Sequence, residues 1–201
     1  VGQMRTAVFV RTAGLVDVFG IRFRLEGAWA LLGSPQSELG GRIVSADDLL
    51  GRDACRWREG LSGVSDRIAW ADAFLRGRIR KHSVPPVLRL AVALAGRSMT
   101  VDEIARAASC SRRHLERLFA EYVGLPPKVF ARISRFQRAL RVRDSRPWIE
   151  VAHECGYADQ AHLIGDFREF AGVSPVQSEM SRTATGSLMS HLLKTTAGEA
   201  F

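Results

Sequence analysis

The sequence predicts an α+β chain, in which a small mixed α/β region over residues 1–85 precedes an all-α domain over 86–177. Three observations support this division. Apolar and basic residues alternate over 21–25, as in a strand with one buried face. From Ala46 the apolar residues follow a helical period, and the second half of the chain contains one helical pattern twice. The remaining residues, 178–201, are expected to form a flexible tail.

Two segments near the start of the chain have the composition of strands. Residues 16–25 are rich in β-forming residues, and within them Ile21, Phe23 and Leu25 alternate with two arginines, which would place the three apolar side chains on one face of a strand. Residues 7–10 (Ala-Val-Phe-Val) form a second candidate strand. The chain opens at Val1 in such strand-like sequence, so the sequence leaves open whether this is a true start or a fragment whose beginning is missing.

A helix with an apolar stripe is predicted toward the end of the first region. The stripe consists of Ile68, Ala71, Leu75 and Ile79, widened by Trp70 and Phe74. Such a stripe packs on its own domain or forms a contact between subunits, and the sequence leaves both interpretations open. Pro85 and Pro86 follow and disfavour helix before them, so we place the domain boundary there.

The second half of the chain contains a repeat. The segment from Ile104 to Leu125 reappears as Val151 to Val173, at an offset of 47 residues that becomes 48 after a turn. Each copy has the pattern of a short helix, a tight turn and a second helix, which is the helix-turn-helix unit that places its second helix in a DNA major groove. A single copy would fit a plain helical hairpin equally well, but two copies favour a double DNA-binding module.

Residues at the predicted helix ends support these units. Thr100 and Glu103 have the spacing of a capping box, while Ser111 and Asp159 can cap the second helix of each copy. An apolar helix over 87–95 is expected to end at Gly96. The predicted core positions of the two units are Val101, Ile104, Ala105, Ala108, Leu115, Leu118, Phe119, Tyr122, Ile149, Val151, Ala152, Leu163, Phe167 and Phe170.

The segment between the copies, residues 127–144, is predicted to be one long connecting helix. Its apolar stripe is Val129, Ile133, Phe136 and Leu140. Its basic residues are Lys128, Arg132, Arg135, Arg138, Arg141 and Arg143. About 17 helical residues span about 25 Å, enough to carry one unit toward the next turn of B-DNA, about 34 Å along. This length favours binding in two adjacent major grooves.

Residues 86–177 resemble the DNA-binding domain of the AraC/XylS family of bacterial transcription regulators. The similarity is carried by Ser-Arg-Arg-His-Leu-Glu-Arg-Leu-Phe at 111–119, Arg-Phe-Gln-Arg-Ala-Leu at 135–140, Gly-Tyr-Ala-Asp-Gln-Ala-His-Leu at 156–163 and Gly-Val-Ser-Pro at 172–175. The resemblance implies about seven helices and sequence-specific DNA binding in transcription regulation. Residues 1–85 resemble only the later part of the sensor region of such regulators, which implies a truncated or divergent sensor or dimerisation region.

The resemblance also implies which residues contact DNA. Positions that contact bases in the family match Arg113, Glu116 and Arg117 in the first unit and Gln160, Ala161 and Gly165 in the second. Relatives commonly carry Arg where this chain has Gly165. Arginine suits guanine O6 and N7, and Glu116 suits cytosine N4. Phosphate contacts are expected from Arg112, His114, Arg135, Arg138, His162 and Arg168.

Composition and the remaining motifs limit the alternatives. The net charge of +8 suits a nucleic-acid partner, although an Arg-rich composition also arises from genome base composition. A non-specific architectural DNA-binding protein is therefore the main alternative. Four residues could imitate a zinc set, but their positions in the repeat favour packing or phosphate contact: Cys110, His114, His153 and Cys155. No catalytic motif is found, and we expect no enzyme activity, metal or cofactor.

Cysteine usage and hydropathy indicate the cell compartment. Three cysteines without a CxxC pair favour a reducing compartment, and the sequence has neither a long apolar run nor a signal peptide, so we expect a cytoplasmic protein without a membrane anchor. Double-stranded DNA is the expected partner. RNA polymerase and a second copy of the chain, joined through the N-terminal region, stay open as further partners, and the sequence identifies no small-molecule effector.

Overall fold

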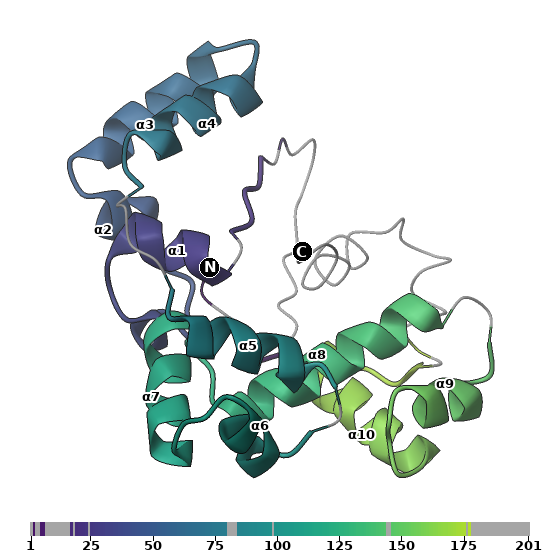
Figure 1. The fold of residues 1–201 in the computed structure, drawn as a ribbon. Coiled ribbons are helices and arrows are strands. Elements are labelled where there is room, and N and C mark those ends of the chain that lie inside the picture. The colour runs from purple at the N-terminus through teal and green to yellow at the C-terminus, as the bar shows by residue number, and fades with distance from the viewer. Residues whose placement is uncertain are drawn as a thin grey trace.

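The computed structural model describes residues 2, 5–6, 17, 19–23, 25–79, 84–97, 99–143, 146–175 and 177, and these residues are helical or irregular without a strand. The helices are α1 (Leu25–Leu32), the 3-10 helix η1 (Gln36–Glu38), α2 (Ala46–Leu50), α3 (Asp53–Gly63), α4 (Arg67–Arg76), α5 (Pro86–Ala95), α6 (Val101–Ala107), α7 (Arg112–Tyr122), α8 (Pro127–Val142), α9 (Trp148–Glu154) and α10 (Gln160–Ala171). Figure 1 shows α3 and α4 as a hairpin that projects away from α5–α10.

The predicted α+β fold class is wrong, because the N-terminal region is helical wherever the structure describes an element. Residues 19–23 form no strand, Ile21 and Phe23 are exposed, and α1 begins at Leu25. A strand needs a neighbour for its backbone hydrogen bonds, and no described segment pairs with 19–23. The second candidate strand, 7–10, and the predicted tail, 178–201, lie outside the described residues.

The α3–α4 hairpin packs around an aromatic cluster of Trp57, Trp70 and Phe74, with ring centroids 5.0–5.4 Å apart. The predicted stripe of α4 is therefore only partly right. Ala71 and Phe74 are buried, but Ile68 is 74% exposed, and Ile79 lies beyond the end of α4 and is also exposed. Because α3 is the main partner of α4, burial is confined to the side of α4 that faces it.

The N-terminal region is attached to the C-terminal end of α7. The ring of Trp29 in α1 lies 4.8 Å from that of Tyr122. Gly124, which follows α7 with φ of 80°, lies so close to η1 that an added Cβ would stand 2.5 Å from the carbonyl oxygen of Gln36. Gly40 makes a similar approach to the Gly124 carbonyl oxygen. A glycine at 124 therefore allows both the left-handed backbone and this contact.

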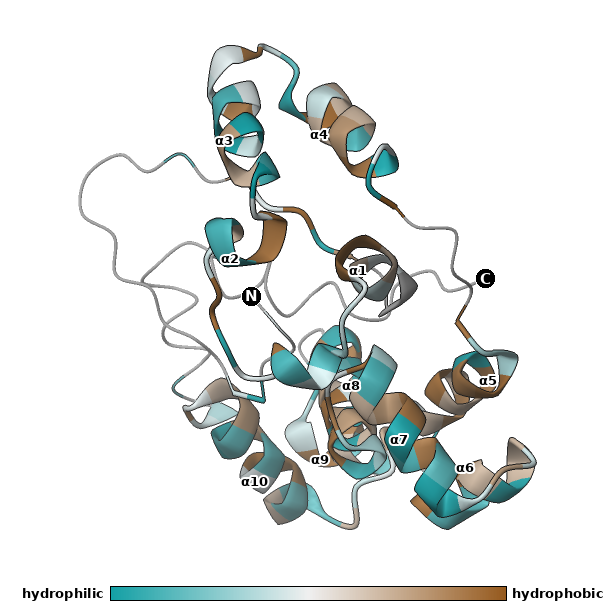
Figure 2. Ribbon diagram, turned by 90° about the vertical axis from the view of Figure 1, so that its left-hand side faces the viewer, coloured by the Kyte–Doolittle hydropathy of each residue, from teal (hydrophilic) through white to brown (hydrophobic). Residues whose placement is uncertain are grey.

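Residues 86–177 form six α-helices within the described residues, and the backbone is again helical at Pro175 and Gln177, where the resemblance implied about seven helices. The helices α5, α6 and α7 enclose one apolar core with the first half of α8, and α9 and α10 enclose the other with its second half. Figure 2 shows α5 to be almost entirely hydrophobic. Most predicted core positions are buried, but Ile149 is 62% exposed.

Candidate nucleic-acid interface

The same type of backbone hydrogen bond closes the turn in both predicted helix-turn-helix units. In the first unit the N–H of Cys110 donates to the carbonyl of Ala105 over 2.9 Å, and in the second the N–H of Tyr157 donates to the carbonyl of Ala152 over 2.9 Å. A bond of this span at the C-terminus of a helix defines the Schellman motif. The two copies therefore share a backbone geometry as well as a sequence pattern.

The left-handed position of this turn differs between the copies. Ser109 occupies it in the first unit with φ of 51°, and Gly156 in the second with φ of 76°. After the turn, Ser111 and Asp159 cap α7 and α10 as predicted, each accepting a hydrogen bond from the backbone N–H three residues later, at 3.2 and 2.7 Å. Ala158 is the additional residue of the second turn. The beginnings of both second helices are thus fixed by side-chain caps.

The exposed side of α7 is charged. Arg113, Glu116 and Arg117 all lie on it. The Glu116 carboxylate accepts a hydrogen bond from Arg112 Nε at 3.0 Å, and Arg117 Nη2 lies 3.1 Å from His114 Nδ1. The first unit therefore presents several guanidinium donors along one face, while Arg112 partly neutralises its acidic residue.

The corresponding positions of α10 are uncharged, although the exposed Arg168 lies on the same side of that helix. The four positions that correspond to Arg112, Arg113, Glu116 and Arg117, 48 residues later, carry Gln160, Ala161, Ile164 and Gly165. Gln160, Ala161 and Gly165 are exposed. A Cβ built on Gly165 has no heavy atom within 4 Å apart from the neighbouring backbone of its own helix, so this position is sterically open.

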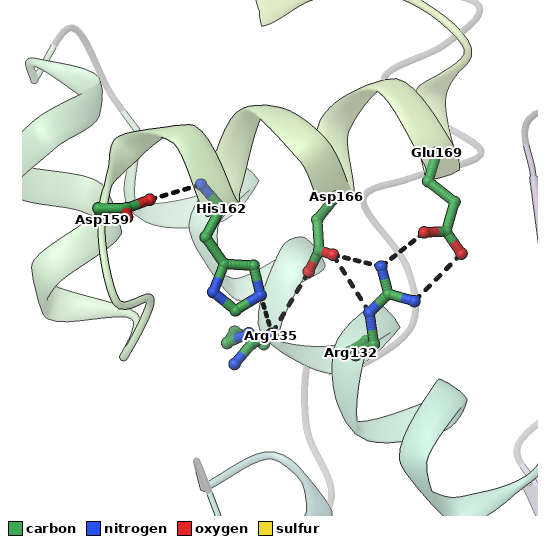
Figure 3. A network of polar contacts seen from close by, with 6 residues as sticks. All are labelled: Arg132, Arg135, Asp159, His162, Asp166 and Glu169. Carbon is green, nitrogen blue, oxygen red and sulfur yellow. Dashed lines mark hydrogen bonds and ion pairs between the residues drawn. The ribbon is translucent and has the colours of Figure 1, made fainter.

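An ion-pair network joins α10 to the connecting helix α8 (Figure 3). The Asp166 carboxylate, 1% exposed, accepts hydrogen bonds from Arg132 at 2.6 and 3.2 Å. Arg132 also donates to Glu169 at 2.6 and 3.1 Å. Arg135 Nη2 lies 3.5 Å from the second oxygen of Asp166 and 3.3 Å from His162 Nε2. Two of the connecting-helix arginines therefore point toward α10.

Aromatic rings complete this network. The guanidinium of Arg135 lies over the ring of Tyr157 at 4.3 Å, and that of Arg132 over Phe170 at 5.0 Å. Burial, helped by the Asp166 charge, raises the pKa of Tyr157. The hydrogen bonds from Arg132 hold the pKa of Glu169 below its ordinary value. The network thus stabilises the ionised form of Glu169 at the edge of an apolar core.

The predicted site residues did not include Asp166 or Glu169, and Arg132 was expected only as one of the basic residues of the connecting helix. A signal for Asp166 was present, since it follows Leu163 by three residues on the helical face that also carries Phe167. An acid on a buried face needs a cationic partner, and the nearby connecting helix supplied several candidates.

The predicted phosphate-binding residues lie in different surroundings. Arg135 and His162 are brought together, and the Arg135 side chain is only 20% exposed. Arg138 is half-buried on α8, whereas Arg168 is exposed on α10. Arg112 and His114 lie in the first turn of α7. The most accessible predicted phosphate ligands are therefore on α7 and α10, not on the connecting helix.

The candidate zinc ligands are not gathered at one point. Within the part of the chain that the structure describes, no three His, Cys, Asp or Glu side chains are grouped as a metal ion would require. Cys110 and Cys155 belong to different units, and burial raises the pKa of the Cys155 thiol. Among the described helices, none combines the length and apolar character needed to cross a membrane.

Known proteins are similar to the second half of this chain. Residues 89–179 match a family model described as a helix-turn-helix domain. The transcriptional regulator ArgR of Pseudomonas aeruginosa is 33% identical over 86 residues, which are 42% of this chain and 26% of that protein. The regulator GbdR of the same species is 36% identical over 77 residues, which are 37% of this chain and 21% of that protein.

A solved structure is also similar. It is a transcriptional regulator from Chromobacterium violaceum, described as an AraC-type DNA-binding domain-containing protein, with 28% identity and a TM-score of 0.45 over 51% of this chain and 96% of that one. The chain spans about a quarter of the length of the curated relatives it matches, and those relatives are named as regulators, not enzymes. Over residues 89–179, the chain is therefore similar to a helix-turn-helix domain, and the relatives that it matches there are named as transcriptional regulators.

Proposed function

We propose that the chain is a sequence-specific transcription regulator that reads DNA with its two helix-turn-helix units in adjacent major grooves. The observation that carries this proposal is the presence of two units with the same turn and the same type of cap at opposite ends of α8 (Figure 1). The 16 residues of α8 span about 24 Å. This length separates the units on the scale of one helical turn of DNA, about 34 Å.

The two second helices take different roles in this proposal. Arg113 and Arg117 donate to guanine O6 and N7, and Glu116 accepts from cytosine N4 once it leaves Arg112. On α10, Gln160 suits the N6 and N7 of adenine, and Ala161 suits a thymine methyl group. Each monomer therefore reads an asymmetric site, with one half favouring G·C pairs and the other favouring A·T pairs.

Phosphate contacts fix the register in the same proposal. Arg112, His114, His162 and Arg168 project from the two second helices and are the accessible candidates. Arg135 and Arg138 on α8 take part from a more buried position, and Arg135 must share its guanidinium with Asp166.

The proposal extends to location and partners. We place the protein in the bacterial cytoplasm with double-stranded DNA, and treat RNA polymerase as a further partner. Homodimerisation is assigned to the N-terminal region, where Ile43 and Ile68 are 66% and 74% exposed. Sedimentation of the full chain at increasing concentration tests the dimer.

Selection of bound sequences from random DNA by the purified chain tests the main proposal. The expected result is one asymmetric site that binds about a thousandfold or more tighter than random DNA at the same salt concentration. Equal affinity for selected and random DNA would instead assign the protein to the non-specific architectural class. Absence of binding even at low salt would overturn both.

A further inference from the structure

The carboxylate of Asp166 is placed to fix α10 in two directions. Its oxygens face Arg132 and Arg135, which are three residues apart on α8 (Figure 3). Through Arg132 the network extends to Glu169, and through Arg135 it extends back to His162 in the first turn of α10. The contacts therefore cover about 10 Å of α10, which restrains both its rotation and its position along α8.

Packing alone does not require a carboxylate at this position. The corresponding residue of the first unit is Leu118, which is 4% exposed within an apolar core. A buried ion pair is often no more stabilising than apolar residues of similar volume, because both charges lose their hydration. What the ion pair adds is direction, since a guanidinium fork bonds a carboxylate in few orientations. Asp166 thus restricts the orientation of α10 more than it stabilises the fold.

The outer face of α10 gives a reason why this geometry matters. α7 carries guanidinium groups that can draw it into register on DNA, but the equivalent positions of α10 carry Gln160, Ala161, Ile164 and Gly165. α10 has one arginine on this side, the exposed Arg168, whereas α7 has Arg112, Arg113 and Arg117. With a single guanidinium of its own to attract phosphates, α10 depends more than α7 on its attachment to the rest of the protein for its orientation in the groove.

We propose that Asp166 is a positioning residue: through Arg132 and Arg135 it fixes the angle and reach of α10, and so determines which spacing between the two half-sites the protein accepts. This proposal rests on the proposed function. It predicts that the network acts on spacing preference separately from stability and from total charge.

The test uses the full chain with Arg132→Met and Asp166→Leu combined, which removes one positive and one negative charge and leaves net charge unchanged. Binding is measured on the selected site and on sites with one base pair added or removed between the halves. One base pair shifts the second half by about 3.4 Å and rotates it by about 35°. We expect the unaltered chain to lose about tenfold or more in affinity on either altered site.

For the double variant we expect a loss of less than about threefold on the altered sites, with a melting temperature close to that of the unaltered chain. The matched control is Arg76→Met with Asp72→Leu, which makes the same replacements in an exposed pair of α4 whose atoms lie 2.6 Å apart. This control should keep the original spacing preference. Arg132→Lys provides a second variant, because it keeps the charge but loses the two-pronged geometry, and it should give an intermediate preference.

Each outcome has a separate meaning. A folded double variant that discriminates spacing as sharply as the unaltered chain overturns the positioning role and leaves Asp166 a structural residue. If the double variant does not fold, an unchanged spacing preference in Arg132→Lys overturns it instead. Failure of the unaltered chain to select any site overturns the proposed function and not this assignment alone.

Discussion

The two helix-turn-helix units share a backbone but distribute their charges in opposite ways. In the first unit Leu118 is buried in an apolar core, and its neighbour Arg117 lies on the exposed face. In the second unit the corresponding residues are Asp166, buried and ion-paired, and Gly165, exposed and uncharged. The same turn and cap geometry therefore tolerates either a buried leucine or a buried acid at this position, provided that the acid has cationic partners.

The largest effect is expected from placing the acid in the wrong unit. Leu118→Asp should lower the free energy of unfolding by about 4 kcal/mol or more, because it removes apolar burial and adds a charge among apolar neighbours. Asp166→Leu should lower it by only about 2 kcal/mol, since Arg132 keeps Glu169 as a partner. Urea unfolding at pH 7 measures both. Equal losses would contradict the distinction between the two cores.

Removing a charge from the exposed face of α7 should change the affinity for DNA and leave the free energy of unfolding unchanged. Arg117→Ala should weaken binding to the selected site by about 1–3 kcal/mol and relax preference at one base pair. Titration on selected and random DNA at one salt concentration measures the effect. If both DNAs lose affinity equally, Arg117 contacts phosphate and not a base.

The turns provide a matched pair of substitutions. Gly156→Ala should destabilise the chain by about 1–2 kcal/mol, because an alanine is strained at φ of 76°. Ser109→Gly should stabilise it by up to about 1 kcal/mol, since it removes the same strain from the first turn. Thermal unfolding compares the two. A loss of stability in Ser109→Gly would show that the serine side chain stabilises its turn.

Adding a charge to the second unit sharpens the comparison further. Gly165→Arg should raise stability by up to about 1 kcal/mol through helix propensity, because the position is sterically open. If α10 lies in a groove, binding should also tighten, and the dependence of log K on log salt should steepen by about 0.9. A variant that is more stable but binds no tighter at any salt concentration would mean that α10 does not approach DNA closely.

The smallest effect concerns acid stability. Because Arg132 lowers the pKa of Glu169 below its ordinary value of 4.5, the pair stabilises the fold above that pH, and this contribution disappears as the pH falls through the lowered pKa. Glu169→Gln should therefore flatten the decline in stability below about pH 5. The difference should stay under about 1 kcal/mol, since Glu169 is 51% exposed. Urea unfolding between pH 3 and 6 measures it, and parallel curves would contradict the assignment.

Local sequence signals predicted the helical domain well. The capping box at Thr100, the caps at Ser111 and Asp159 and the apolar faces of α7 and α10 are all confirmed, because each depends on residues within one helical turn. The strand at 21–25 was predicted from the same kind of local pattern and was wrong. A strand depends on a partner segment, which a local pattern does not contain.

The site depends more strongly on tertiary contacts than the helices do. The positions of Arg113 and Gly165 on exposed faces follow from helical period alone. By contrast, Arg135 was grouped with phosphate ligands, although α10 brings Asp166 to within 3.5 Å of it. Its role depends on how α8 and α10 cross, and residues 31 positions apart give no local sign of that contact.

The inward-facing arginines of α8 also affect how the molecule would meet a DNA duplex in solution. Although the chain carries a net charge of +8, Arg132 and Arg135 face carboxylates, so these two guanidinium groups contribute less to the outward field than the exposed Arg113 and Arg117 of α7. Diffusional encounter would then be oriented, with the first unit arriving before the second. The association rate would depend on salt concentration because the charges of α7 attract the phosphates. The lifetime of the complex would depend on how well α10 then fits its groove.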